Sequence, residues 1–469
     1  MLSIITAILL NISLLTGNPA TSKAKISVMV KDLTDGQIVE QYQPSKPATP
    51  ASVTKLLTTA SALETLGENF RFSTKVVYSG EVIDSVLHGD LIVLGNIDPT
   101  LGAPDKKIPL EQSAAQLTTD WVARLHHKGI KSINGRIIAD MSRLNNEGYN
   151  PYWLWEDIGN YYAPAIWGLN YMRNTLNIYL NSGACGSRAN VVRTYPQIEG
   201  LEVTSTVTCT RISKDLSYVS GKALDNSRAM RGEIPSNKGD FCVKGDLPNP
   251  GLQLAIDLQK AIEKAGGKVT GQPQYIFKSV SSDTPLKTAF VHHSQPLREI
   301  IKVTNEESNN MYAEALGRYL VSRYQTQSGS QQAAQHLYHY WKNRHMPMSG
   351  CVLKDGCGLA PQNKLTASML VQLLARMYYG KQRKAWFNSL PISGKTGTLT
   401  HFLENTSLEG KVHAKSGTLT GTKCFAGYIQ RPNGHLWAFA VLVSDTGGPT
   451  DPIQKAIEKY LLSLDKINK

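Results

Sequence analysis

The stretch Ala51-Ser52-Val53-Thr54-Lys55-Leu56-Leu57 places a serine and a lysine three residues apart at the start of a predicted helix. Apolar residues recur at helical spacing, which predicts a buried stripe made of Val53, Leu56, Leu57, Ala60 and Leu63. Thr49 suits the N-cap of this helix, Pro50 its first position and Gly67 its end. The spacing brings the serine hydroxyl and the lysine amine to one face, as an activated serine nucleophile requires.

The Ser-x-x-Lys spacing alone is weak, because it occurs three times, at Ser22, Ser52 and Ser463. Ser22 lies beside a predicted cleavage site, and Ser463 lies among charges at the end of the last predicted helix. A solvated helix face is the simpler interpretation of an isolated copy. Ser52 stands apart because of the motifs that follow it.

Two later motifs carry polar groups suited to the same site. Ser308-Asn309-Asn310 lies at a break between two predicted helices, where helix capping is the alternative interpretation. Lys415-Ser416-Gly417-Thr418 lies on a predicted edge strand, which can line a cleft and pair with an extended peptide. The similar Lys395-Thr396-Gly397-Thr398 lies in a glycine-rich loop, so we predict no role for Lys395.

Composition limits the class of protein. The 469 residues allow two or three domains. The net charge of +13 indicates either solubility alone or attraction to an anionic surface such as nucleic acid, a membrane or a cell-wall polymer. No basic run with interleaved aromatic residues appears, which argues against nucleic acid. The apolar run 2–15 predicts a signal peptide over residues 1–20, with a core strand as the alternative, although a basic n-region is missing. No second long apolar run follows, so we expect an exported protein without a membrane span.

The six cysteines show no tight ligand spacing with histidine, which argues against zinc. An exported protein can form disulfides, and Cys351 with Cys357 is the local candidate pair. The remaining connectivity stays open.

The order Ser52-x-x-Lys55, Ser308-x-Asn310, Lys415-Ser416-Gly417 resembles that of penicillin-binding proteins and serine β-lactamases. The long block between the first two motifs narrows the resemblance to class C low-molecular-mass penicillin-binding proteins, the D-alanyl-D-alanine carboxypeptidase/endopeptidase family. Further stretches resemble this family: Gly89-Asp90-Leu91 through Asp98-Pro99-Thr100, Trp153-x-Trp155-x-Asp157, Tyr162-Ala163-Pro164, Ser308-Asn309-Asn310 with Ala313-Glu314, and Asp355-Gly356-x-Gly358-Leu359. Ser416 and Cys357 depart from it, standing where threonine and serine are usual.

The resemblance implies an α/β (α+β) fold. A catalytic domain with an antiparallel sheet flanked by helices, like that of penicillin-binding proteins and serine β-lactamases, would span 21–75 and 290–469. The inserted region 76–289 would form two smaller β-rich modules, one from 76–170 with 247–289 and the other from 171–246.

The resemblance also implies the reaction. Ser52 would attack the carbonyl of a terminal D-Ala-D-Ala bond and form an acyl-ester, with Lys55 taking its proton. Ser308 would pass a proton to the leaving amine. Water would then release the acyl group without a metal or cofactor, and β-lactams would act as covalent inhibitors.

The remaining motif residues would bind substrate, a peptidoglycan stem peptide. Asn310 would bind its backbone, and Lys415 with Ser416 and Thr418 would hold its terminal carboxylate. Gly417 belongs to the same substrate-binding motif, and backbone N–H groups of Ser52 and Thr418 would form an oxyanion hole.

Asp157 lies in an aromatic and acidic stretch, residues 153–162. A carboxylate among tryptophans could bind the ammonium of a diamino acid in the stem peptide. A surface loop packed by its own aromatic residues is the alternative.

Three other functions use the same motifs. A β-lactamase would share the acylation step, although the large insertion argues against it. A catalytically silent cell-wall scaffold would not need both lysines. A transpeptidase differs only in the acceptor of the acyl group, and the sequence leaves it open, as it leaves open endopeptidase preference and oligomeric state.

Overall fold

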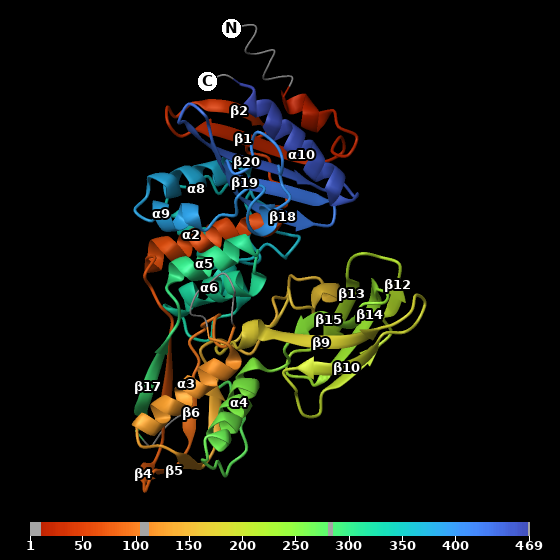
Figure 1. The fold of residues 1–469 in the computed structure, drawn as a ribbon. Helices are drawn as coiled ribbons and strands as arrows, with labels where there is room; N and C mark the ends of the chain where they lie inside the picture. The colour runs from red at the N-terminus through yellow and green to blue at the C-terminus, as the bar shows by residue number, and fades with distance from the viewer. Residues whose placement is uncertain (1–10, 104–111, 280–284, 468–469) are drawn as a thin grey trace. The chain divides into compact units, whose positions relative to one another are not determined.

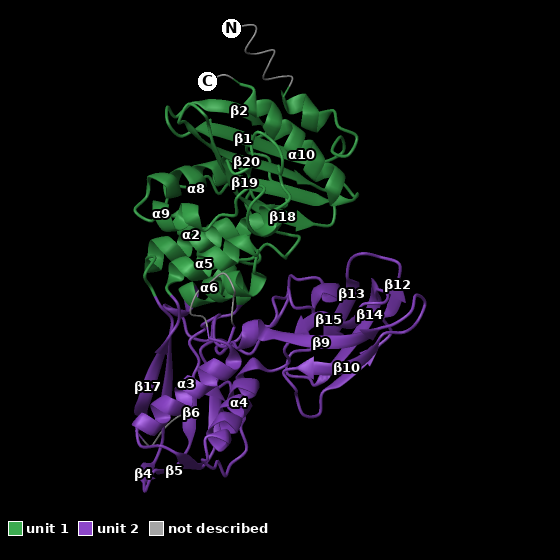
Figure 2. Ribbon diagram, viewed as in Figure 1, with its two compact units in different colours: residues 1–70, 296–320, 330–469 green, residues 71–295, 321–329 purple. Residues whose placement is uncertain are grey.

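The computed structural model describes residues 11–103, 112–279 and 285–467 (Figure 1). The chain divides into two compact units (Figure 2). Unit 1 comprises residues 1–70, 296–320 and 330–469, and unit 2 comprises residues 71–295 and 321–329. The domains predicted from the sequence, including the two inserted modules, stay a prediction; segment 321–329 groups with unit 2, although it lies in the predicted catalytic range.

Unit 1 combines one sheet with helices. Its strands are β1 (Lys25–Asp32), β2 (Ile38–Tyr42), β18 (Val412–Leu419), β19 (Thr422–Gln430) and β20 (Leu436–Ser444). Its helices are η1 (Ala51–Thr54), α2 (Lys55–Leu66), α5 (Leu297–Glu306), α6 (Asn310–Ser322), α7 (Ser330–Lys342), α8 (Ala367–Tyr379), α9 (Arg383–Asn388), η4 (Gly397–Leu399) and α10 (Thr450–Asp465).

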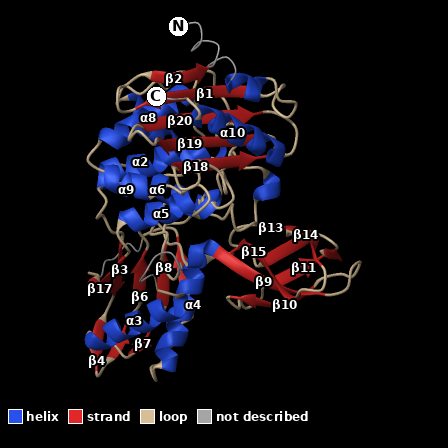
Figure 3. Cartoon of the chain, turned by 45° about the horizontal axis from the view of Figure 1, so that its top comes forward, coloured by secondary structure: helices blue, strands red, loops and turns tan. Residues whose placement is uncertain are grey.

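The sheet of unit 1 is antiparallel, with strand order β18-β19-β20-β1-β2. Every residue of β20 is buried, which requires cover on both faces of the sheet. Trp437, Phe439 and Val441 pack with residues of α10 in one core. Ala438 and Ala440 alternate with them along β20, and α8 also packs against this strand (Figure 3). The predicted α+β fold with a helix-flanked antiparallel sheet is confirmed, and Lys415 lies on the edge strand, as predicted.

The central helix differs from the prediction only at its start. The five stripe residues of α2 and the preceding turn are fully buried, and Gly67 ends the helix at φ +80°. The predicted cap is wrong: Ala51–Thr54 forms a 3-10 turn, Pro50 occupies the N-cap, and no side chain caps it. The Thr49 hydroxyl instead accepts a hydrogen bond from Lys364 Nζ at 2.6 Å.

Unit 2 is richer in strands. Its strands are β3 (Ser73–Tyr78), β4 (Glu81–Ile83), β5 (Val86–His88), β6 (Leu91–Leu94), β7 (Ser132–Asn134), β8 (Ile137–Asp140), β9 (Thr175–Ser182), β10 (Asn190–Tyr195), β11 (Glu202–Ser205), β12 (Thr208–Thr210), β13 (Leu216–Gly221), β14 (Ser227–Pro235), β15 (Gly239–Asp246), β16 (Gln274–Ile276) and β17 (Lys287–His293). Its helices are α3 (Ala114–His127), α4 (Pro250–Lys264), η2 (Trp155–Asp157) and η3 (Met172–Asn174).

The described part of unit 2 contains two larger hydrophobic cores and a small cluster of Val77, Ile92 and Ile138. Helices α3 and α4 pack with the sheet β16-β8-β6-β3-β17 around Trp121 and Trp167. A second core, around Leu176, Ile178 and Met230, lies among the strands β9 to β15. Mixed α+β structure therefore extends through both units.

The structure describes only part of the predicted signal peptide, since its first ten residues lie outside the described ranges. Residues 11–16 are helical, and Leu15 is buried in the core that contains α10, so a core strand is wrong for this part. The export signal itself stays a prediction. No helix in the described ranges is long and apolar enough to cross a membrane.

The suggested Cys351–Cys357 disulfide is wrong in this structure. All six cysteines, each of which lies in the described part of the chain, are free thiols. Cys351 and Cys357 are both buried, and the Cys357 thiol faces the Asp355 carboxylate at 3.5 Å. Packing therefore accounts for Cys357 without a covalent partner.

Candidate active site

Ser52 lies in the short turn η1, just before α2 begins. The preceding residue, Ala51, has φ +47°, a left-handed conformation that is strained for a residue with a side chain. Two glycines let other segments approach this turn. A Cβ at Gly417 would lie 2.4 Å from Pro50 O, and a Cβ at Gly358 would lie 1.9 Å from Ala51 O. Strand β18 and the loop after Asp355 therefore hold the serine turn closely from two sides.

Lys55 is the first residue of α2 and is fully buried. Its Nζ contacts Ser52 Oγ at 2.9 Å, Asn310 Oδ1 at 2.5 Å and the Cys357 carbonyl at 2.7 Å. The amine is thus aimed at the hydroxyl predicted to be the nucleophile, and two fixed oxygens orient it.

Lys415 is the second fully buried lysine of the site. Its Nζ donates to Ser308 Oγ at 2.9 Å and to the Ser416 carbonyl at 2.8 Å. Ser308 lies between α5 and α6 at φ +57°, so the predicted helix break is a tight left-handed turn that carries the hydroxyl. The structure therefore brings all three predicted motifs together within unit 1.

The open side of β18 presents backbone donors. Ala414 N donates to Pro391 O at 3.0 Å, away from the neighbouring strand β19. Because N–H groups alternate along a strand, those of Ser416 and Thr418 point to the same open side. The Thr418 hydroxyl accepts a hydrogen bond from Lys423 Nζ at 3.0 Å.

Both lysines have lowered pKa values. For Lys55 the main cause is burial, which disfavours the ammonium and outweighs the favourable charges near Cys357, Asp355 and Glu314. The pKa of Lys415 falls well below its usual range because of burial, and then because of the positive charges of Lys55 and Lys423. A lysine with a lowered pKa can act as the free amine near neutral pH.

Several contacts of the site have no sequence motif of their own. The Ser416 hydroxyl donates to Thr398 Oγ1 at 2.7 Å, so the loop that carries the second Lys-Thr-Gly-Thr copy reaches the site through its threonine. Lys395 of that copy instead pairs with Glu409, and its side chain is 56% exposed; its lack of a role stays a prediction. Lys55 also donates a hydrogen bond to the backbone carbonyl of Cys357, and the sequence cannot predict this contact because every residue type has that carbonyl.

The hydroxyls of the two other Ser-x-x-Lys serines donate to carbonyls three residues earlier in the chain. Ser22 Oγ donates to Pro19 O at 3.3 Å, and Ser463 Oγ donates to Tyr460 O at 2.6 Å within α10. A backbone carbonyl cannot act as a base for the serine proton. Neither of these serines therefore shows a contact like that of Ser52 with the Lys55 amine.

Asp157 is a residue of unit 2. The Tyr162 hydroxyl donates to Asp157 Oδ1 at 3.0 Å. Burial is the main cause that raises the pKa of Asp157, and the neighbouring Glu156 charge adds to it, whereas the Tyr162 hydrogen bond lowers it. Trp155 beside it is 75% exposed. A half-buried carboxyl next to exposed aromatic surface fits either a ligand contact or a self-packed loop.

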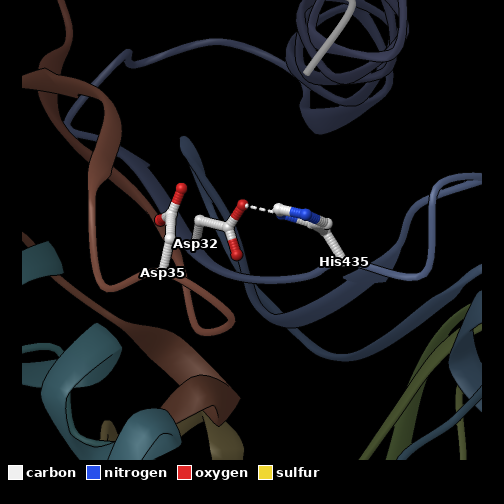
Figure 4. A group of neighbouring side chains, drawn as sticks. All are labelled: Asp32, Asp35 and His435. Carbon is white, nitrogen blue, oxygen red and sulfur yellow. Dashed lines mark hydrogen bonds and ion pairs between the residues drawn. The ribbon is translucent and has the colours of Figure 1, made fainter.

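A group of possible metal ligands, Asp32, Asp35 and His435, lies elsewhere in unit 1 (Figure 4). Asp32 is buried, and its carboxylate accepts hydrogen bonds from His435 Nδ1 at 2.6 Å, Trp437 Nε1 at 3.0 Å and Thr34 N at 2.8 Å. These contacts already use the carboxylate oxygens. The group therefore ties the β1–β2 hairpin to the start of β20 and has a structural explanation.

The site combines a serine and a buried lysine on one helix, a second serine and an asparagine at a helix break, and a lysine on an edge strand. With the helix-flanked antiparallel sheet, this is the architecture of the penicillin-binding-protein class of serine enzymes.

Comparison with known proteins identifies the family. A sequence model of the D-Ala-D-Ala carboxypeptidase 3 (S13) family matches residues 9–463. The D-alanyl-D-alanine carboxypeptidase of Actinomadura sp. (strain R39) is 26% identical over 463 residues, which cover 94% of this chain and 81% of that protein. The chain therefore belongs to the D-Ala-D-Ala carboxypeptidase 3 (S13) family, whose members are serine-type carboxypeptidases, as the sequence resemblance implied.

Solved structures share the fold. Penicillin-binding protein 4 (dacB) from Haemophilus influenzae superimposes with a TM-score of 0.82 at 21% identity, covering 97% of this chain and 99% of that one. The predatory endopeptidase Bd0816 from Bdellovibrio bacteriovorus, solved with an immunity protein, gives a TM-score of 0.53 at 17% identity, covering 94% of this chain and 93% of that one. Both comparisons confirm the architecture.

Proposed function

We propose that this protein is an exported serine D-Ala-D-Ala carboxypeptidase that cleaves peptidoglycan stem peptides through an acyl-serine intermediate. The observation that carries the proposal is the contact of buried Lys55 Nζ with Ser52 Oγ at 2.9 Å, within a chain of the S13 family. Relatives across that family carry the carboxypeptidase name, including DacB of Haemophilus influenzae. The net charge of +13 suits an anionic wall polymer.

Acylation would begin at Ser52. Lys55, as the free amine, takes the hydroxyl proton while Oγ bonds to the carbonyl carbon of the penultimate D-alanine. The tetrahedral oxyanion is held by the N–H groups of Ser52 and Thr418, the second of which lies on the open side of β18. The C–N bond then breaks, and the leaving D-alanine amine receives a proton through Ser308. Water adds to the acyl-ester and releases Ser52 for the next cycle.

The substrate carboxylate would bind on β18. Lys415, Ser416 and Thr418 present an amine and two hydroxyls beside the open edge of the strand. In its ammonium form, Lys415 would pair with the carboxylate that ends the substrate. Asn310, which contacts Lys55, would hold the peptide backbone that precedes the scissile bond. Gly417 lets the strand approach the serine turn.

β-Lactams would acylate the same serine, because Ser52 Oγ would attack the lactam carbonyl and open the ring amide to leave a covalent acyl-ester. A Haemophilus influenzae penicillin-binding protein 4 structure with a bound β-lactam shares this fold, with a TM-score of 0.75 at 21% identity. Cleavage of cross-links is a second candidate activity, because endopeptidases occur among the fold relatives and the attacked bond would be chemically similar.

The first test is labelling with a fluorescent penicillin, comparing wild type with Ser52→Ala and measuring intact mass. We expect one adduct on wild type and none on the variant. Labelling of both would place the nucleophile elsewhere, and no labelling of a folded wild type would favour the silent scaffold. Fast turnover of the penicillin would favour a β-lactamase.

Asp157 is proposed to bind the side-chain ammonium of a diamino acid in the stem peptide. Asp157→Asn should lower activity on such stems and spare a simple blocked D-Ala-D-Ala dipeptide. Glu156→Gln is the matched control, because this neighbouring acid is exposed. Equal loss on both substrates in Asp157→Asn would contradict the role.

A further inference from the structure

The loop 355–360 supplies one of the three contacts of Lys55 and is itself built around a buried carboxylate. Asp355 accepts hydrogen bonds from Gly358 N at 2.7 Å, Ala360 N at 2.7 Å and Asn363 Nδ2 at 2.6 Å. These bonds fold the loop back on itself. The fold leaves the Cys357 carbonyl aimed at Lys55 Nζ, 2.7 Å away.

A second buried carboxyl, Glu314, anchors this loop to α6. Its Oε1 accepts a hydrogen bond from Gly356 N at 2.6 Å, and its side chain is 2% exposed. The Gly356 carbonyl accepts a bond from Thr58 Oγ1 of α2 at 2.6 Å. The backbone of Gly356, the residue before Cys357, is thus held between the helix that carries Lys55 and the helix that carries Asn310.

Helix α6 presents these groups in one row. Asn310, Glu314 and Arg318 follow one another at intervals of four residues, so they lie on the same face of the helix. Glu314 and Arg318 are buried, and Asn310 contacts Lys55 directly. One helix face therefore holds Lys55 twice, once through Asn310 and once through Glu314 and the loop.

The charges around Glu314 come from three elements: Lys55 on α2, Arg318 on α6, and Asp355 with Cys357 in the loop. Burial is the main cause that raises the pKa of Glu314 to about 7, and the Asp355 charge adds to it. Arg318, the Gly356 N–H and Cys357 oppose the rise. As an anion, Glu314 favours the ammonium form of Lys55; as a neutral acid it does not.

We propose that Glu314 is a positioning residue for the acylation step: it holds the Cys357 carbonyl against Lys55 through the 355–360 loop and sets the fraction of Lys55 present as free amine. This inference rests on the proposed role of Lys55 as the base. The sequence motifs from which the site was predicted assign no role to Glu314. Glu314 acts through the loop and through its charge, without touching the substrate.

Two substitutions separate the two parts of this role. Glu314→Gln keeps a side-chain oxygen for Gly356 N and removes the charge. The acylation rate of this variant by fluorescent penicillin is measured from about pH 5 to about pH 10. The pH at which the rate falls to half on the acidic limb of the profile should be about one unit lower than in wild type, because the anion that favours the Lys55 ammonium is gone. Glu314→Asp keeps the charge and shortens the reach, so we expect acylation to slow about tenfold or more at every pH with the limb in place.

The matched control is Glu40→Gln. Glu40 is also a buried carboxyl of unit 1, and burial raises its pKa to about 7, but the groups that oppose this rise are Tyr460 and the backbone of Ile12, outside the site. Its acylation profile should superimpose on that of wild type. Thermal unfolding of each variant confirms that the folded enzyme is being compared.

An unchanged limb in folded Glu314→Gln, or an equal shift in Glu40→Gln, would overturn the assignment. If Glu314→Gln does not fold, Glu314→Asp decides, and a wild-type rate in that variant refutes the positioning role. Ser52→Ala labelled in parallel distinguishes the failures. If it labels as wild type does, the proposed function is wrong. If it does not label while the Glu314 variants behave as wild type, only the present inference is wrong.

Discussion

Replacing Gly358 by alanine tests whether the 355–360 loop must contact the serine turn. The added Cβ would lie 1.9 Å from Ala51 O, whereas ordinary contacts begin near 3.4 Å. The obstacle is backbone, so no side-chain rotation relieves it. The loop and the turn must separate by about 1.5 Å, which is enough to break the 2.7 Å bond from Lys55 Nζ to the Cys357 carbonyl.

The expected loss is large because the displaced groups are the nucleophile and its base. A misplacement of about 1 Å costs roughly 100-fold in rate, or about 2.7 kcal/mol in activation free energy. We therefore expect acylation of Gly358→Ala by a fluorescent penicillin to be at least about 100-fold slower than wild type. Rates are normalised to the folded fraction, which thermal unfolding measures.

Gly36→Ala is the matched control for backbone strain. Gly36 has φ +79° and Gly358 has φ +86°, so an alanine at either position adopts a left-handed backbone conformation that destabilises the folded state by about 1 kcal/mol. A Cβ at Gly36 meets nothing within 4 Å. Gly36→Ala should lose a few degrees of unfolding temperature and acylate within about twofold of wild type. If Gly358→Ala acylates as fast as Gly36→Ala, the close approach does not position the base and the reasoning fails.

Three further predictions follow from the site and its surroundings. Lys395→Ala should cleave a D-Ala-D-Ala peptide within about twofold of the wild-type rate, because the Lys395 side chain is exposed and pairs with Glu409. Lys415→Ala should slow the same cleavage about 100-fold, because Lys415 contacts Ser308 in the site. Equal loss in both variants would contradict the assignment. Asp32→Asn should lower the free energy of unfolding by about 2 kcal/mol without changing acylation. Burial raises the pKa of Asp32, but the hydrogen bond of His435 and those of Thr34 and Trp437 lower it further, so the net shift is downward. The stabilisation by Asp32 is therefore present above the ordinary carboxyl pKa and is lost as pH falls through the lowered pKa of the folded state. A difference in unfolding free energy between wild type and Asp32→Asn that persists in strong acid would refute this prediction. Acylation should rise with pH as Lys55 becomes the free amine, with a midpoint below the usual 10.5 because burial lowers its pKa, and a midpoint at 10.5 would exclude Lys55 as the base.

The local features of the site were predictable because they depend on residues close together in the chain. Helical spacing placed Ser52 and Lys55 on one face, and Gly67 ends that helix as expected. The break at Ser308 and the edge strand of Lys415 likewise follow from neighbouring residues. The cap at Thr49 was mispredicted, since the positive φ of Ala51 depends on the segments packed against the turn.

The contacts that turn these residues into a site join distant parts of the chain. The bond from Lys55 to the Cys357 carbonyl spans 302 residues, and the contact uses the backbone, which every residue type shares. Thr398 of the second motif copy contacts Ser416, whereas Lys395 of the same copy pairs with Glu409. Side-chain patterns carry no signal for such contacts.

The family, the helix and strand that carry the reactive groups, and the order of the three motifs can all be predicted from the chain, because spacing and hydrophobic periodicity are local properties. The full burial of Lys55 and Lys415, and the bond from the loop that holds Lys55 to Glu314, become visible only once the chain is folded. Burial and its effect on a pKa arise from all the atoms packed around a group, and those atoms come from segments far apart in the chain.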